Sequence, residues 1–303
     1  MDPSPPNAQL GRGYFYAALT VAIWSGFILV SRLGGKSPLT GWDVTALRFG
    51  TAALVLLPLW LLRRPRLTFS LRMVILAITG GCGYGALVYA GFKLTSAAHG
   101  AVLLPGMLPF AVALMAWLML GERPSRQRWV GLTGIAAGVV CLATDSFSGS
   151  PGDWRGDLLI LAASLSWAIY TVLVRRWQVS PWDATLGVGL VSAALYLPIY
   201  CLWLPKNLAA ASWCVIGLQA FYQGILAVIV AMMFFMRAVT ILGPTRVGTL
   251  MALVPAIAGI SAAPLLGEPL SPWLMTGLFL VSLGAWVGSQ NRLFMRKTEP
   301  CPT

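Results

Sequence analysis

The sequence has very little charge for its length. Only 10% of its 303 residues are Asp, Glu, Lys or Arg, and 58% are hydrophobic. Soluble globular domains carry roughly 25% charged and about 45–50% apolar residues. So few charges cannot cover a surface that faces water. We therefore exclude a soluble globular fold and expect a protein that is solvated by lipid.

Acidic residues and histidine are especially scarce. The chain has nine Asp and Glu residues, all in expected loops, tails or ends of apolar runs, and one histidine, His99. An enzyme site within the membrane needs a nucleophile with a base, or a set of metal ligands. We therefore expect no enzyme activity, no metal and no other cofactor.

Cysteine pairs and clustered basic residues are also missing. The five cysteines form no C-x-x-C motif, which argues against a disulfide framework or a zinc site. The net charge of +12 comes from residues spread between apolar runs, so nucleic acid is not an expected partner. The N-terminal segment lacks the basic n-region of a secretory signal peptide.

Long apolar segments are what the sequence does contain. A helix needs roughly 20 apolar residues to cross the hydrocarbon core. Ten segments qualify, at residues 14–33, 43–62, 71–92, 97–119, 128–145, 156–176, 184–204, 213–237, 245–266 and 272–291. The loops between them are short, so we expect no soluble domain among them.

The distribution of Lys and Arg predicts how these spans are oriented. If both termini are cytoplasmic, inside segments hold 15 of the 21 basic residues and outside segments hold five, with Arg48 inside the second span. Positive charge favours the cytoplasmic side of a membrane. We therefore expect short cytoplasmic tails at residues 1–12 and 292–303.

An internal repeat relates the two halves of the chain. The motif Leu-Gly-Glu-x-x-Ser occurs at residues 120–125 and again 146 residues later, at 266–271. Other residues pair at this offset or at 143: Pro109 with Pro255, Gly121 with Gly267, Glu122 with Glu268, Trp24 with Trp167, and Arg32 with Arg175. The order of these pairs indicates a duplication, with repeats at residues 13–146 and 156–291.

Each repeat contains five spans, so the second repeat must cross the membrane in the opposite sense. The charges agree, because the loop after the second span is rich in arginine and its counterpart after the seventh holds only Lys206. Inverted repeats are typical of secondary transporters, which bind substrate near the middle of the membrane. The predicted fold is an all-α polytopic membrane protein with ten transmembrane helices in two inverted five-helix repeats.

Several ordered segments resemble the drug/metabolite transporter superfamily in its ten-span form with two EamA-type repeats. They are "AIWSGFILVSR" (22–32), "SLSWAIYTVLVRR" (164–176), "TALRFG" (45–50), "TSAAHGAVLLPGMLPFAVALMAWLMLGERPS" (95–125) and "LGPTRVGTLMALVPAIAGISAAPLLGEPLS" (242–271). The resemblance covers nearly the whole chain. Within the superfamily, the chain looks most like bacterial amino-acid exporters, including those for aromatic amino acids.

This resemblance implies an exporter of small metabolites in the bacterial inner membrane that works by alternating access. Its partners would be a small-molecule substrate and the lipid bilayer, and we expect a monomer. A multidrug exporter for cationic compounds is the alternative within the same superfamily. An ion channel is the alternative from another class.

Four aromatic residues are candidates to line a substrate cavity: Trp24, Tyr84, Trp167 and Tyr170. The two tryptophans are equivalent in the repeats and lie about ten residues into their spans, away from the interfaces where tryptophan usually anchors a helix. Indole rings at this depth can stack on a planar or apolar substrate. Packing between helices is the alternative for each of them.

Three polar residues are further substrate-binding candidates. Gln219 and Gln223 are four residues apart, on one face of the eighth span, and His99 begins the fourth. Amides in lipid are costly unless they bond a partner or line a wet cavity. Hydrogen bonds between helices are the alternative for the glutamines, and a hydrogen-bonded interfacial residue is the alternative for His99.

Five residues are candidates for helix kinks and gating in the fourth and ninth spans: Pro105, Gly106, Pro109, Gly248 and Pro255. Proline removes a backbone hydrogen bond and bends a helix. Static kinks without motion are the alternative.

Two further expectations concern charge within the spans. We expect Arg48 to extend to the interface or to pair with Asp43, rather than to bind substrate. No acidic residue lies in the middle of an expected span, where proton- and sodium-coupled antiporters usually place one. We therefore expect a uniporter or exchanger without a carboxylate proton relay.

Overall fold

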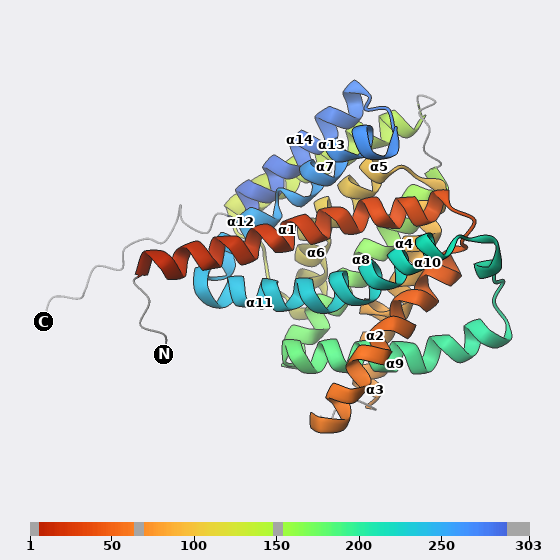
Figure 1. Cartoon of the computed structure of the whole chain (residues 1–303). Helices are drawn as coiled ribbons and strands as arrows, with labels where there is room; N and C mark the ends of the chain where they lie inside the picture. Colours follow the sequence, from red (N-terminus) through yellow and green to blue (C-terminus); the bar gives the residue numbers. More distant parts are fainter. Residues whose placement is uncertain (1–5, 64–69, 148–153, 290–303) are drawn as a thin grey trace, which may run out of the picture.

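The computed structural model of the chain describes residues 6–63, 70–147 and 154–289 (Figure 1). These residues form helices and include no strand. The expected tail at 292–303 lies outside the described residues, as do residues 1–5 of the N-terminal tail.

The helices follow one another in two similar series. The first half contains α1 (Pro6–Lys36), α2 (Gly41–Arg63), α3 (Leu71–Gly80), α4 (Cys82–Leu94), α5 (Ala97–Ala101), the π-helix η1 (Val102–Gly106), α6 (Leu108–Leu120) and α7 (Arg126–Phe147). The second half contains α8 (Trp154–Arg176), α9 (Pro181–Leu202), the 3₁₀ helix η2 (Leu208–Ala210), α10 (Trp213–Gln219), the π-helix η3 (Ala220–Val230), α11 (Ala231–Leu242), α12 (Pro244–Met251), α13 (Val254–Leu266) and α14 (Pro272–Ser289).

These elements account for all ten expected spans. Four spans are built from successive helical segments, namely α3–α4, α5–η1–α6, α10–η3–α11 and α12–α13. In the described residues, nine helices are long and apolar enough to cross a membrane. The tenth expected span is α7, which packs along α14. The prediction of an all-α polytopic membrane protein is therefore confirmed.

Serine side chains begin many of these helices, because the first backbone amides of a helix have no partner within it. Ser70, Ser180 and Ser212 accept hydrogen bonds from the amides three residues later. Ser125 and Ser271, the last residues of the repeated motif, do the same before α7 and α14. These five serines therefore cap the helices that follow them.

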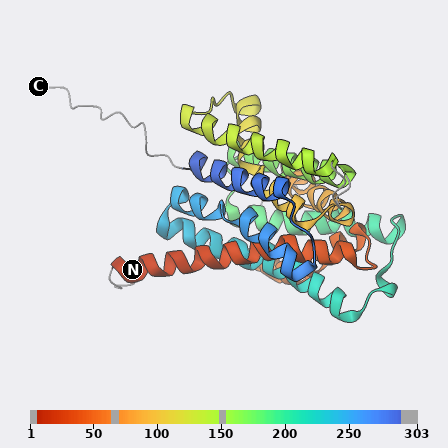
Figure 2. The same ribbon diagram turned by 90° about the horizontal axis from the view of Figure 1, so that it is seen from above.

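The two halves interleave instead of forming separate bundles. α1 packs along α11, α2 against α9 and η3, α4 against α8, and α7 along α14. Figure 2 shows the last of these pairs clearly, with α7 in yellow-green beside α14 in blue. Each pair joins one helix from each repeat, so the repeats share one core and any cavity between them is lined by both.

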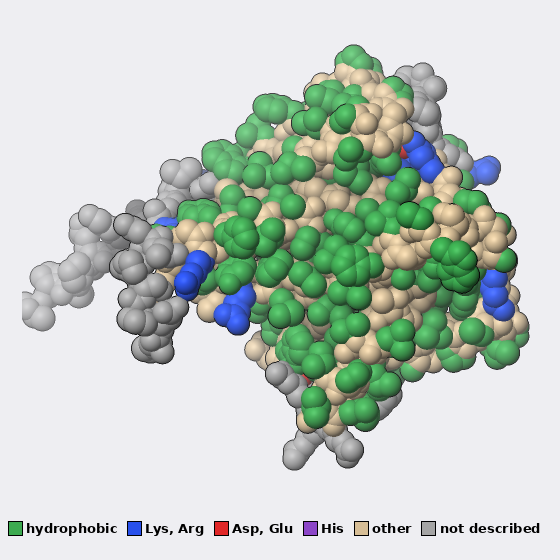
Figure 3. Space-filling view, in the orientation of Figure 1, with side chains coloured by type: hydrophobic (Ala, Val, Ile, Leu, Met, Phe, Trp, Pro, Cys, Tyr) green, Lys and Arg blue, Asp and Glu red, His purple; other side chains and the backbone are tan. Residues whose placement is uncertain are grey.

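We name the two ends of the bundle by their helices. The terminal end is where α1 begins and α14 ends, which Figures 1 and 2 place on the left. The distal end contains residues 36–41, 94–97, 202–213 and 266–272. Hydrophobic side chains cover the middle of the face in Figure 3, and Lys and Arg lie toward the two ends. This is the distribution expected for a surface in lipid.

The repeated motif ends equivalent helices at opposite ends of the bundle. α6 and α13 each have 13 residues, with Pro109 or Pro255 in the first turn. Gly121 (φ 71°) and Gly267 (φ 66°) close these helices in the left-handed conformation that glycine adopts without strain. α6 ends at the terminal end and α13 at the distal end, as inverted repeats require.

Candidate functional site

A cavity of about 460 Å³ lies between the two repeats. Helices of both repeats line it, from Trp24 and Phe27 in α1 to Gly284 and Ser289 in α14. The lining extends from the middle of the bundle toward the terminal end, and none of it comes from the distal end. None of the described side chains that line it is acidic.

The four aromatic residues expected at a substrate site all line this cavity. Three of them form a continuous group, because the ring centroids of Tyr84 and Trp167 are 4.7 Å apart and those of Trp167 and Tyr170 are 5.0 Å apart. Trp24 packs on Phe235 instead, at 5.3 Å. Aromatic walls of this kind bury apolar or planar groups of a ligand.

Gly80 makes room for this aromatic group. A Cβ atom at position 80 would lie 2.3 Å from the ring of Tyr170, where no side chain can fit without moving that ring. The close approach of α3 to α8 therefore depends on glycine at this position.

Arg48 lines the same cavity. It lies seven residues after Gly41, the first residue of α2, which is about 10 Å along the helix axis. The expected pair with Asp43 is not formed, because that carboxylate bonds Thr40, Tyr200 and the amide of Asn207. Arg48 is also 7% exposed, so it does not reach the surface.

Gln219 and Gln223 do not line the cavity, and both are fully buried. Gln219 donates to the carbonyl of Val30 at 2.7 Å, and Gln223 donates to Ser31 Oγ at 3.1 Å. Tyr89 Oη in turn donates to Gln223 Oε1 at 3.1 Å. These bonds join η3 and α10 to α1 and α4, which is the helix–helix alternative described above.

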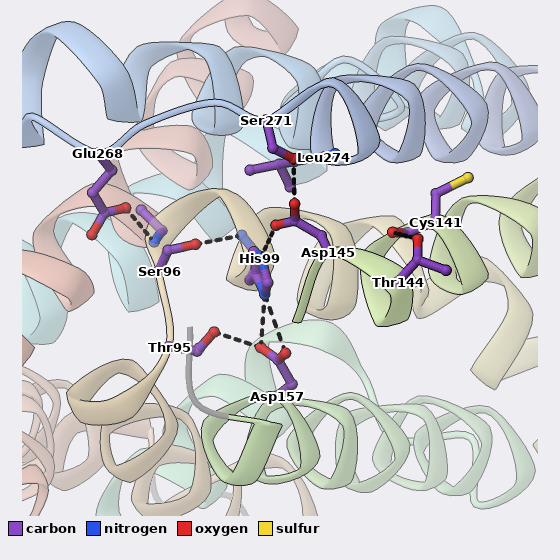
Figure 4. Close-up of polar contacts among 11 residues, drawn as sticks. Thr95, Ser96, His99, Cys141, Thr144, Asp145, Asp157, Glu268, Ser271 and Leu274 are labelled. Atoms are coloured by element: carbon purple, nitrogen blue, oxygen red, sulfur yellow. Dashed lines mark hydrogen bonds and ion pairs between the residues drawn. The ribbon is translucent and has the colours of Figure 1, made fainter. Parts of the chain in front are cut away.

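His99 lies away from the cavity, in a polar cluster near the distal end (Figure 4). Its Nε2 is 2.9 Å from Asp145 and its Nδ1 is 3.1 Å from Asp157. Asp145 also accepts a hydrogen bond from Ser271, and Asp157 accepts one from Thr95. The cluster connects α5, α7, α8 and α14, which the sequence separation of its members did not indicate.

Two equivalent ion pairs lie at opposite ends of the bundle. Arg32 contacts Glu268 at 2.6 Å at the distal end, where the side chains are 13% and 6% exposed. Their repeat counterparts, Arg175 and Glu122, are 2.7 Å apart at the terminal end, where they are 53% and 51% exposed. The same contact is therefore buried at one end and open to solvent at the other.

The residues expected to kink or gate helices lie around the cavity. Pro105, Pro109, Gly248 and Pro255 line it. Gly106 does not, and a Cβ there would lie 2.3 Å from Val281. Pro105 lies in the π-helix η1, and Pro109 and Pro255 are the second residues of α6 and α13, which follow breaks in their spans. The breaks are real, and their motion stays a prediction.

The described residues contain no group of three or more His, Cys, Asp or Glu side chains that could hold a metal ion. The only described histidine is engaged with Asp145 and Asp157, as above.

Similarity to known proteins agrees with this architecture. The chain is 32% identical to the threonine/homoserine exporter RhtA of Escherichia coli (strain K12), over 84% of this chain and 82% of the relative. It is 27% identical to a probable amino-acid metabolite efflux pump of Salmonella typhimurium, over 90% and 93% of the two chains.

A solved crystal structure shares the fold. It is 21% identical to this chain and matches it with a TM-score of 0.62, over 91% of this chain and 96% of the other. One family model matches the chain twice, at residues 11–144 and at residues 154–289, which is once in each half of the bundle. On these matches, the chain is a multi-pass membrane protein that belongs to the EamA-like transporter family.

Proposed function

We propose that this transporter exports amino acids or similar small zwitterionic metabolites by alternating access, as a uniporter or an exchanger. The observation that carries this proposal is the cavity between the repeats. It combines aromatic walls, the buried Arg48, the exposed Arg128 and no acidic side chain among the described lining residues. A neutral or zwitterionic molecule with an apolar part fits this chemistry.

The difference between the two ends supports alternating access. The cavity extends toward the terminal end, whereas the distal end is crossed by the His99 cluster and by the buried Arg32–Glu268 pair. If the termini are cytoplasmic, as the Lys and Arg distribution predicts, the structure is in an inward-facing state. Export would then begin with substrate entering from the terminal end.

The names of the relatives support the choice of cargo. One is described as a threonine/homoserine exporter and another as a probable amino-acid metabolite efflux pump. By analogy, we propose a bacterial inner-membrane location, a monomeric transport unit and no enzyme activity for this chain.

The two alternatives are less well supported. A cationic drug would meet Arg48 in the cavity and no described acidic side chain, although the aromatic group could contact a cation through its ring faces. An ion channel needs a continuous path, and the distal end is crossed by ion pairs between helices.

The test is transport of a panel of radiolabelled amino acids into proteoliposomes, with and without a pH gradient. We expect saturable flux that the gradient does not change. Replacing Trp167→Ala should reduce it by about tenfold or more, because truncating an aromatic hot-spot side chain at a binding site costs about 2 kcal/mol or more. The matched control is Trp213→Ala, since Trp213 is 87% exposed and away from the cavity.

Each part of the proposal can fail separately. If cationic compounds are transported and no amino acid is, the proposed cargo is wrong, and the proposal that the protein is a transporter is retained. A substrate current that reverses under an imposed pH gradient alone would overturn the uniport or exchange mechanism. If Trp167→Ala and Trp213→Ala lose flux equally, the proposal that Trp167 contacts the substrate is wrong.

A further inference from the structure

We infer that Arg48 binds a carboxylate group of the transported molecule, so that the cavity selects carboxylic acids over their amides and amines. The inference rests on the proposed function, because it assigns a residue and a chemical class to the same transport site.

The first argument is that Arg48 is a buried cation without an anion. Its side chain is 7% exposed, and no carboxylate of the described residues lies within 4 Å of it. Its Nε atom is buried and has no hydrogen-bond partner among the residues that the structure describes. An uncompensated charge in a membrane protein is costly and is kept where it meets a partner or a functional ligand.

The second argument is that the protein holds the guanidinium in place through Nη1, the one Arg48 nitrogen that has a hydrogen bond among the described residues. Arg48 Nη1 donates to Tyr89 Oη at 3.0 Å. That hydroxyl donates its own hydrogen bond to Gln223 Oε1 at 3.1 Å, so it accepts the bond from the guanidinium through a lone pair. The polar chain therefore orients Arg48 and supplies no negative charge to neutralise it.

The third argument is the immediate apolar surroundings of the cation. The rings of Phe27 and Phe49 lie 5.5 and 5.7 Å from the Arg48 Cζ atom. Both residues also line the cavity. Rings at this distance attract the cation and reduce its contact with water, which strengthens its pairing with an incoming anion.

The shape of the Arg48 guanidinium indicates which anion it binds. A guanidinium presents a planar fork of N–H donors that matches the two oxygens of a carboxylate. The aromatic group of Tyr84, Trp167 and Tyr170 lines the same cavity and can take an apolar substituent. One carboxylate at Arg48 and an apolar body against these rings describes an amino acid or a 2-oxo acid.

The test compares matched molecules in the wild-type protein. For leucine, phenylalanine and threonine, the acid, its amide, its decarboxylated amine and its 2-oxo acid are tested by tryptophan fluorescence quenching in detergent and by counterflow in proteoliposomes. We expect each amide and amine to bind about tenfold or more weakly than its acid, as expected for loss of a charge-assisted bidentate contact.

Variants then assign the effect to Arg48. Arg48→Met should lose the preference for the acid over the amide, and Arg48→Lys should keep part of it. Arg237→Met is the matched control, because Arg237 is exposed and does not line the cavity. If Arg48→Met does not give a monodisperse protein, the inference is tested by the preference for acids over amides in the wild-type protein and in Arg48→Lys.

The outcomes separate this inference from the proposed function. Binding of acids and amides with equal affinity, an unchanged preference in Arg48→Met, or no binding of any acid overturns the role of Arg48. Selective binding of 2-oxo acids, without transport of any amino acid, supports the role of Arg48 and overturns amino-acid export.

Discussion

At the scale of single residues, equivalent positions in the repeats have different surroundings. Trp167 lies against both Tyr84 and Tyr170, whereas its counterpart Trp24 packs on Phe235. The cavity is therefore asymmetric, with its continuous aromatic group contributed by α4 and α8. A substrate would contact the two halves through different chemistry.

Gly80 offers a test of how tightly this aromatic group is packed. Gly80→Ala should lower transport several-fold and destabilise the protein by about 1–3 kcal/mol, because the added methyl group overlaps the Tyr170 ring. Transport assays and thermal unfolding in detergent measure the two effects. Gly217→Ala is the control, since a Cβ there meets nothing within 4 Å. A Gly80→Ala protein equal to the wild type in both assays would contradict the packing.

The sequence predicted part of the cavity lining at this scale, and binding of substrate there stays a prediction. Four aromatic residues could be predicted, because an aromatic residue deep in an apolar span can be recognised from the sequence itself: Trp24, Tyr84, Trp167 and Tyr170. The lack of an anionic partner for Arg48 could not be predicted. Asp43 is only five residues away in the sequence, but its carboxylate accepts a hydrogen bond from Tyr200, which is 157 residues away. Pairing between helices depends on tertiary packing that local spacing does not contain.

At the scale of helices, α7 and α14 approach through glycine. A Cβ at Gly131 would lie 2.6 Å from the carbonyl oxygen of Gly284 and 2.7 Å from the amide nitrogen of Gly288. Small residues at a helix interface let the backbones of membrane helices pack closely. The contact joins the last span of each repeat, so its loss would separate the two halves there.

Gly131→Ala should therefore lower the stability of the protein by about 1–3 kcal/mol, as overpacking does in other cores. Gly134→Ala is a graded comparison, because its Cβ would approach no atom closer than 3.3 Å and it should cost less. Thermal unfolding in one detergent gives both values. The reverse order of the two variants would show that this helix pair is packed differently.

Helix positions were predictable from the sequence to a large extent. Apolar runs located the ten spans, because a membrane-crossing helix needs a long uninterrupted apolar segment. The breaks in spans 3 and 8 were not predicted, because neither Gly81 nor the π-helix η3 is marked by proline. Departures from regular helix at such positions depend on packing and on side-chain bonds from other helices.

At the scale of the whole molecule, the orientation in the membrane stays a prediction that labelling can decide. In a cysteine-free background, Lys206→Cys places an exposed thiol at the distal end and Ser125→Cys places one at the terminal end. On intact cells, an impermeant maleimide should label Lys206→Cys alone. Labelling of Ser125→Cys alone would reverse the predicted orientation and make the structure outward-facing.

The two equivalent ion pairs predict unequal effects of the same substitution. Glu268→Gln should destabilise this conformation by about 3 kcal/mol, because it leaves a largely buried Arg32 without its carboxylate. Glu122→Gln should cost less than about 1 kcal/mol, because its partner is exposed to solvent.

The measurement is thermal unfolding of both variants in the same detergent, with Arg32→Met, Arg175→Met and the two double variants completing the two double-mutant cycles. Equal shifts for Glu268→Gln and Glu122→Gln would mean that the two ends do not differ in burial as described. A larger shift for Glu122→Gln would indicate that the opposite state predominates in detergent.

The duplicated ion pair also bears on the energy balance of transport. If the two halves exchange roles, Arg32 and Glu268 become hydrated as Arg175 and Glu122 lose water, so one desolvation cost replaces another of the same kind. The two end states can then have nearly equal free energy even though each contains a buried charge pair. Such a transporter can reorient on thermal energy alone, and the concentration gradient of its cargo is enough to set the direction.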